Sequence, residues 1–103
     1  MEYNLSDYIG NDSVILKDYF ESRDYDNHLE KHQWILTDKK ILHSYQCMGS
    51  YYLDITSLKH ISHIKVNGSG ITCYLDSKSS ITILCSNHEL ALSFLQELSK
   101  RII

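Results

Sequence analysis

Apolar and polar residues alternate with a period of two along most of residues 32–85, and short polar turns interrupt the alternation. In the run ITCYL, Ile71, Cys73 and Leu75 fall on one face of a strand, because successive strand side chains point to opposite sides. The same holds for ITILC at 81–85. Alternation over four to eight residues is typical of a half-buried strand, so the pattern predicts an antiparallel meander.

Turn-forming residues separate the apolar runs. The segment Thr37–Lys40 divides HQWIL from ILHSYQC, NGSG at 67–70 divides HIKV from ITCYL, and DSKSS at 76–80 divides ITCYL from ITILC. Asp, Asn, Ser, Thr and Gly favour turns because they hydrogen-bond their own backbone or tolerate positive φ. With a further strand SYYLDI at 50–55 and a first strand SVILKDYF at 13–20, we expect about seven strands between residues 13 and 85.

The period becomes helical after residue 86. Ser86 and Glu89 have the spacing of a capping box, and two basic residues stand at 100 and 101, where cations suit the helix dipole. One stripe of the helix predicted over about 87–102 carries the apolar residues Ala91, Phe94, Leu95, Leu98 and Ile102. The open end of a curled sheet is the natural place to bury that stripe. We therefore predict one mainly β domain over residues 1–103, a partly open seven-stranded barrel capped by the C-terminal helix.

Composition supports one small soluble domain. The chain has 103 residues, of which 43% are hydrophobic, and no run of about 18 apolar residues occurs. Its first ten residues lack the basic flank and apolar stretch of a signal peptide, so we expect a cytoplasmic protein. Three widely spaced cysteines, Cys47, Cys73 and Cys85, do not form a disulfide framework and fit a reducing compartment.

Charge is distributed unevenly along the chain. Residues 1–30 have a balance of −6 and the remaining residues +3. An acidic surface repels phosphate, and the later positive charges form no dense patch, so we expect neither direct nucleic-acid binding nor phosphoinositide or membrane binding. Acid-rich segments are also commonly just solvated surface, and this second interpretation stays open.

The sequence contains no recognisable catalytic or metal motif. It has six histidines, but no nucleophile elbow, phosphate-cradling glycine loop or paired-carboxylate motif. Three spaced pairs resemble metal ligands: His28 with His32, His60 with His63, and Cys85 with His88. Residues three apart on a strand face opposite sides, and a thiol on an apolar strand face behaves as a core residue. We expect no enzyme, cofactor or metal site, although the sequence does not decide whether a histidine cluster binds metal. An enzymatic function would require a pocket that gathers two or more histidines with an acid.

Two stretches resemble the bacterial pleckstrin-homology-like and GRAM-like domains. WILTDKKIL at 34–42 is similar to that family's strand-turn-strand signature, and YYLDITSLKHI at 51–61 is similar to its strand, Asp-Ile and small polar bend. With the terminal helix, the resemblance covers about residues 8–103. It implies a sharply bent seven-stranded sheet closed at one corner by the helix. The family's lipid-binding Lys and Arg residues surround the first interstrand loop, where this chain has the acidic ESRDYDNHLEK at 21–31.

Such folds carry many functions, so the function has to be argued from sites. The chain's eight tyrosines exceed the needs of a small core, and tyrosine is favoured at protein interfaces, although tyrosines also serve as cross-strand partners. We predict a non-catalytic module that binds a protein, a peptide or a second copy of itself through an exposed strand edge or a tyrosine-bearing face. The predicted binding residues are Tyr19, Arg23, Tyr25 and His28 in the first loop, with Tyr51 and Tyr52 on the middle strand.

A different function remains open on the same fold. The acidic front could make the chain a small inhibitor or immunity protein, of cellular or phage origin, that blocks a basic site on a toxin or nucleic-acid enzyme. Its binding surface would then consist of Asp24, Asp26 and Glu30. The two hypotheses differ in salt dependence, because charge-steered association slows as salt rises and aromatic contacts hardly respond.

Overall fold

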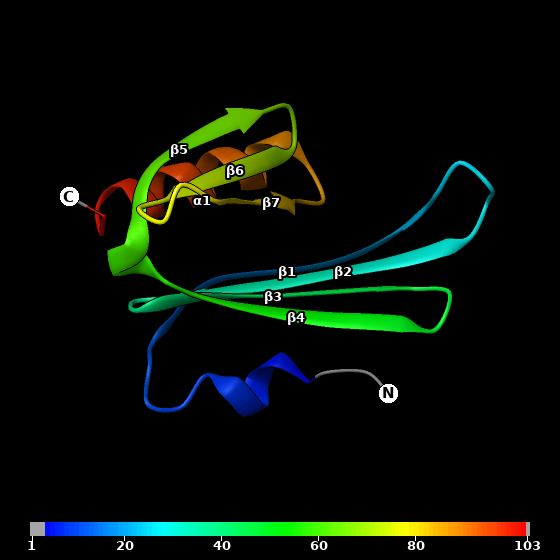
Figure 1. Cartoon of the computed structure of the whole chain (residues 1–103), viewed down its shortest axis with the longest axis horizontal. Helices are drawn as coiled ribbons and strands as arrows, with labels where there is room; N and C mark the ends of the chain where they lie inside the picture. Colours follow the sequence, from blue (N-terminus) through cyan, green and yellow to red (C-terminus); the bar gives the residue numbers. More distant parts are fainter. Residues whose placement is uncertain (1–3, 103) are drawn as a thin grey trace.

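The computed structural model of the protein describes residues 4–102, which form two antiparallel sheets and one α-helix (Figure 1). Sheet A has the order β1-β2-β3-β4 and sheet B the order β5-β6-β7. The elements are β1 (Val14–Arg23), β2 (Leu29–Thr37), β3 (Lys40–Cys47), β4 (Ser50–Ser57), β5 (Ile61–Asn67), β6 (Gly70–Leu75), β7 (Ser80–Leu84) and α1 (His88–Ser99), with 3-10 segments η1 (Leu5–Tyr8) and η2 (Leu58–His60). The predicted mainly β fold with a C-terminal helix is confirmed. The seven strands divide into sheets of four and three, and no strand pairing closes them into a barrel within residues 4–102.

The tight turn between β2 and β3 is held by its own side chains. Thr37 Oγ1 accepts the backbone N–H of Lys40 at 2.9 Å and donates to the Asp12 carboxylate at 3.0 Å. Asp38 was expected to bond its own backbone, but it accepts the N–H of Ser13 at 2.9 Å. The Lys40 ammonium pairs with Asp12 at 3.2 Å. The turn therefore also anchors the segment that enters β1.

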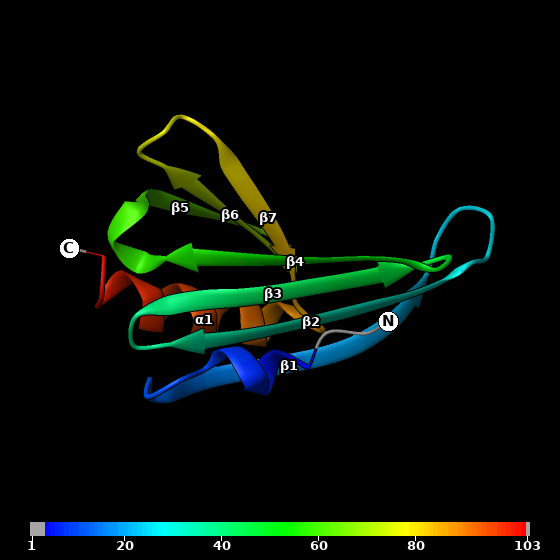
Figure 2. The ribbon, with the colours of Figure 1, turned by 60° about the horizontal axis from the view of Figure 1, so that its bottom comes forward.

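The main core lies between the two sheets and the helix. Trp34 of β2 meets Phe94 of α1 edge-on, with ring centroids 4.8 Å apart, and both side chains are fully buried. Ile71 and Cys73 of β6 pack in the same core. Figures 1 and 2 show α1 and sheet B on the same side of sheet A, with sheet B beyond β4 in the second view. The apolar stripe predicted for the helix is confirmed, since Ala91, Phe94 and Leu98 are buried.

A second, smaller core covers the opposite face of sheet A. Leu5 of η1 packs there on Ile35 and Leu42, and Leu53 of β4 joins them. We call this the outer face, and the face that carries Trp34 the inner face. Because strand side chains alternate, the apolar positions of β4 lie on the outer face and its inner positions are polar.

The helix begins one residue later than the capping-box interpretation requires. Asn87 is the N-cap, and its Oδ1 accepts the N–H of Leu90 at 2.8 Å. Ser86 donates its backbone N–H to Asp18 Oδ2 at 2.7 Å and thereby ties the helix entrance to β1. The predicted cap at Ser86 is therefore wrong, and the helix ends at Ser99 rather than near residue 102.

The two hairpins of sheet A are longer than sheet B. In Figures 1 and 2 the β1–β2 and β3–β4 hairpins project well past the ends of β5, β6 and β7. The inner face of their far half is therefore not covered by sheet B or by α1. Within residues 4–102, no helix is long and apolar enough to cross a lipid bilayer.

Candidate binding site on the inner face of the long hairpins

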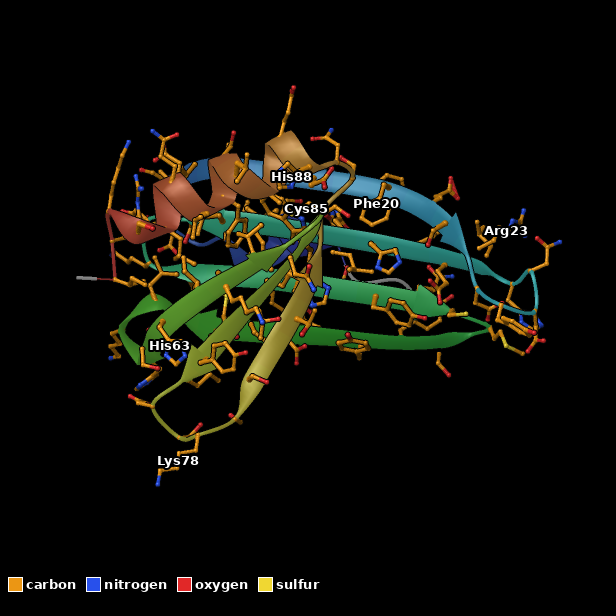
Figure 3. The ribbon with its side chains drawn as sticks, turned by 90° about the horizontal axis from the view of Figure 1, so that it is seen from above. Phe20, Arg23, His63, Lys78, Cys85 and His88 are labelled. Atoms are coloured by element: carbon orange, nitrogen blue, oxygen red, sulfur yellow. The ribbon has the colours of Figure 1, made fainter. Side chains whose placement is uncertain are left out.

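A row of four rings crosses all four strands of sheet A where the hairpins leave sheet B. Phe20 stacks on His32 with centroids 4.6 Å apart, His32 meets Tyr45 edge-on at 5.1 Å, and Tyr45 lies 5.5 Å from Tyr52. Each ring stands directly opposite the next in the strand register. Directly opposed side chains contact each other across a sheet, so the register itself builds this aromatic row. Figure 3 shows Phe20 on this uncovered part of the sheet.

A carboxylate next to the row fixes its polar atoms. Glu30 Oε1 accepts the hydroxyl of Tyr45 at 2.8 Å, and Oε2 accepts that of Ser22 at 3.2 Å and lies 3.4 Å from His32 Nε2. The Tyr45 hydrogen bond is the main reason why the pKa of Glu30 is lowered. Burial, followed by Glu30, raises the pKa of Tyr45. Glu30 is therefore ionised and Tyr45 protonated at neutral pH, which keeps the hydrogen bond intact.

His43 is a buried polar side chain without a hydrogen-bond partner for Nδ1 within residues 4–102. Its side chain is only 4% exposed, and Nδ1 lies 3.8 Å from Asp54 Oδ2, too far for a hydrogen bond. Burial is the largest influence on the pKa of His43 and lowers it, which keeps the imidazole neutral at pH 7. Buried polar atoms in native proteins almost always have a partner, so this nitrogen indicates that a ligand or a water binds here.

His43 and the aromatic row line one pocket. Its walls are His32, His43, Tyr45 and Tyr52 of sheet A together with Thr82 and Leu84 of β7, and it encloses about 210 Å³. The pocket therefore sits at the junction where sheet A continues beyond sheet B. Leu84 remains partly exposed there and supplies an apolar wall.

Charged residues are segregated between the two faces of sheet A. Among its described residues, the inner positions include the acids Asp18, Glu30 and Asp54, and neither Lys nor Arg occurs at these positions. The outer positions carry Lys17, Arg23, Lys31 and Lys40 together with one acid, Glu21. Because alternation sends neighbouring residues to opposite faces, the register concentrates negative charge around the pocket.

A second polar cluster closes the β1–β2 hairpin. One ligand-type atom each from Asp24, Glu30 and Cys47 lies within 4.8 Å of the others. Asp24 Oδ1 accepts the backbone N–H groups of Asp26 and His28 at 2.9 and 2.8 Å, and Oδ2 lies 3.2 Å from His28 Nδ1. The His28 backbone bond is the main cause that lowers the pKa of Asp24. Both carboxylates are thus already engaged by protein donors, which is the arrangement of a structural hairpin cluster.

The predicted first-loop residues lie along the β1–β2 hairpin. Tyr19 and Arg23 belong to β1 rather than to the first loop, which comprises only residues 24–28. Tyr25 is fully exposed at the tip, where the Arg23 guanidinium donates to the carbonyl of Asn27 at 3.1 Å. Figure 3 shows Arg23 near the tip of this hairpin, far from sheet B. His28 bonds Asp24 in the same tip, so Arg23, Tyr25 and His28 lie close together there, whereas Tyr19 lies farther along β1.

The predicted tyrosines of β4 point to opposite faces. Tyr51 lies on the outer face, where it shares a pocket of about 90 Å³ with Tyr19 and the polar residues Lys31, Gln33, Ser44 and Gln46. Tyr52 lies on the inner face and belongs to the aromatic row. Only Tyr52 of the predicted binding residues therefore lines the pocket that holds His43.

The residues of the alternative acidic surface lie together at the end of the β1–β2 hairpin. Asp24 and Glu30 belong to the polar cluster described above and accept its hydrogen bonds, and Asp26 is exposed in the adjoining turn. The spaced pairs considered as metal ligands also have other contacts: His60 pairs with Asp76, His63 stacks on Tyr74, and His88 bonds the carbonyl of Gly68. Figure 3 shows Cys85 and His88 near each other at the start of α1, where the Cys85 side chain is buried in the main core.

Sequence reasoning missed most of the pocket. His43, Tyr45 and Asp54 were not selected, because each looks unremarkable within its own strand, and His32 was considered only as a metal ligand with His28. The available signal was the pair of tight turns at 38–39 and 48–49, which determines the register and places these residues opposite one another.

No protein-family model matches the sequence, and no curated protein matches it.

Proposed function

We propose that the chain is a non-catalytic module of the bacterial pleckstrin-homology-like type that binds a protein or peptide at the pocket on the inner face of sheet A. The observation that carries the proposal is the pocket itself, an aromatic-walled site of about 210 Å³ on the part of the sheet that sheet B leaves uncovered. The succession of four strands, three strands and a terminal helix agrees with the arrangement that the family resemblance implies.

The chemistry of the pocket supports recognition rather than catalysis. Glu30, Tyr45 and Ser22 hold one another in hydrogen bonds that fix the ring positions. His43 and Asp54, which would have to cooperate in proton transfer, are 3.8 Å apart. Rigid aromatic side chains around a small pocket are typical of the anchoring points in protein interfaces.

A peptide selection tests this proposal. A random peptide library displayed on phage is selected against the immobilised protein, and each enriched peptide is measured against Tyr52→Leu and Tyr51→Leu. We expect Tyr52→Leu to weaken binding about tenfold, since an interfacial aromatic anchor contributes more than about 1 kcal/mol. Tyr51→Leu is the matched control, because it removes the neighbouring ring from the opposite face.

Two outcomes would point to a different binding site or a different partner. Peptides that lose binding to Tyr51→Leu and not to Tyr52→Leu would contradict the proposal. They would favour the pocket that Tyr51 and Tyr19 share on the outer face. Light scattering addresses self-assembly: a dimer that Tyr52→Leu dissociates and Tyr51→Leu does not would make a second copy of the chain the partner. Thermal unfolding of both variants verifies that each is folded.

The inhibitor function remains a second candidate, and the segregation of charge favours it. The acids of the inner face, rather than the tip residues Asp24 and Asp26, would then face a basic site on a toxin or nucleic-acid enzyme. An association rate that falls steeply as salt rises, measured on a captured basic protein, would support this candidate.

A further inference from the structure

We propose that the pocket receives the side chain of a lysine or arginine from a basic segment of the partner. This inference rests on the proposed function and specifies the chemistry of what is bound. Three independent features of the described residues support it: the rings, the charges around them, and the unpartnered nitrogen of His43.

The rings provide a surface that attracts a cation. Tyr45 and Tyr52 lie 5.5 Å apart, tilted by 39°, and both line the pocket. A Lys or Arg group within about 6 Å of a tyrosine ring centroid is attracted by the negative face of the ring. The aliphatic part of such a side chain would pack against Leu84, as long basic side chains commonly do with apolar surface.

The charges favour a cation over every other kind of anchor. Glu30 bonds Tyr45 on one side of the pocket, and Asp54 approaches His43 on the other. Within residues 4–102, the inner positions of sheet A contain no Lys or Arg that would neutralise these acids. An acidic partner segment would therefore be repelled, whereas a basic one would be attracted.

His43 offers an acceptor for an N–H group of the bound lysine or arginine. When the neutral ring carries its proton on Nε2, Nδ1 accepts a hydrogen bond, and this buried Nδ1 has no partner among the described residues. An ammonium or guanidinium group is rich in donors and has no acceptor. A basic side chain between Nδ1 and the Asp54 carboxylate would satisfy the nitrogen and pair with the acid, a combination that a neutral or acidic side chain does not offer.

The test uses single amino acids as probes. N-acetyl-lysine methylamide and N-acetyl-arginine methylamide are titrated into the whole chain and followed by NMR of the aromatic side chains, with N-acetyl-glutamine methylamide as the neutral control. We expect the basic probes to shift the resonances of Tyr45, Tyr52 and His43 and to leave Tyr51 unchanged. Asp54→Asn should weaken binding at least about fivefold, because it removes one charge from the pocket. Asp26→Asn, which removes an acid from the distant hairpin tip, should change it less than about twofold.

Each outcome separates the two proposals. Enriched phage peptides that depend on Tyr52 and are rich in Lys or Arg support both. Peptides that depend on Tyr52 but lack basic residues, together with no response to the basic probes, would overturn the present inference and leave the proposed function standing. If the basic probes bind but no Tyr52-dependent peptide is recovered, the pocket takes a free cation, and both proposals are wrong.

Discussion

Neighbouring residues of sheet A have different surroundings because strand side chains alternate. Tyr51 and Tyr52 are adjacent in sequence, yet one lies beside Gln46 on the outer face and the other beside Tyr45 in the pocket. His43 is held under the same pocket with Nδ1 unpartnered among residues 4–102. The surroundings of a side chain therefore follow from the face of the sheet to which its position points and from the pairing register of its strand, not from its residue type.

The burial of His43 predicts a pH dependence of stability. Burial lowers the pKa of His43 from 6.5, and nearby His32 also lowers it, against an opposing influence of Asp54. Below pH 6.5 the unfolded chain binds a proton at this position and the folded chain does not. The free energy of unfolding therefore falls as the pH decreases from about 6.5 to the lowered pKa, and His43 has no such effect at higher pH.

This expectation is checked with urea unfolding at pH 7.5 and 5.5. The loss of stability between the two values should be smaller in His43→Gln than in the wild type. His60→Gln serves as the control, because the His60 side chain is 55% exposed. An equal loss in the wild type and His43→Gln would show that His43 is not the responsible group.

The sequence predicted the helix α1 but not the residue at which it begins. Periodicity located α1, but the choice between Ser86 and Asn87 as N-cap depends on which side chain reaches the free N–H groups. In the structure the Ser86 backbone is drawn toward Asp18 of β1, which moves the start of the helix by one residue. A contact 68 residues away in sequence therefore decides a local boundary.

We expect Asn87→Ala to destabilise the protein by about 1 kcal/mol, because it removes the acceptor for the N–H of Leu90. Ser86→Ala should cost less than about 0.5 kcal/mol, since Ser86 contributes its backbone N–H, which alanine retains. Denaturant unfolding followed by circular dichroism measures both. A larger cost for Ser86→Ala than for Asn87→Ala would restore the capping-box interpretation.

The two sheets of the molecule depend on one shared core. Sheet A contributes Trp34 to that core, sheet B contributes Ile71 and Cys73, and the helix contributes Phe94. Because no strand pairing joins the two sheets within residues 4–102, side-chain packing is what fixes their relative position. The pocket, whose walls come from both sheets, depends on the same packing.

We therefore expect Phe94→Ala to cost about 3–5 kcal/mol, a large part of the stability of a small domain. Leu92→Ala, on the exposed side of the same helix, should cost less than about 1.5 kcal/mol. Fluorescence of Trp34, the single tryptophan, reports the unfolding of the shared core in urea. Similar costs for the two variants would mean that α1 does not hold the sheets together.

Much of the fold follows from local patterns. The alternation from residue 32 to 85 predicted the strands, and the polar segments at 37–40, 67–70 and 76–80 predicted the turns. The apolar stripe Ala91, Phe94 and Leu98 predicted the buried side of the helix. These features depend on side-chain periodicity and turn chemistry, which act over a few residues and are therefore readable from one sequence.

The pocket was decided by contacts between distant segments. Phe20, His32, Tyr45 and Tyr52 become one row because four strands pair in a particular register, and β7 adds its wall because the helix and the core place sheet B there. The placement of Asp18, Glu30 and Asp54 on the inner face, without a Lys or Arg among the described inner positions, has the same origin. Local sequence cannot specify such a site, because a shift of one residue in strand pairing would turn every one of its side chains to the opposite face.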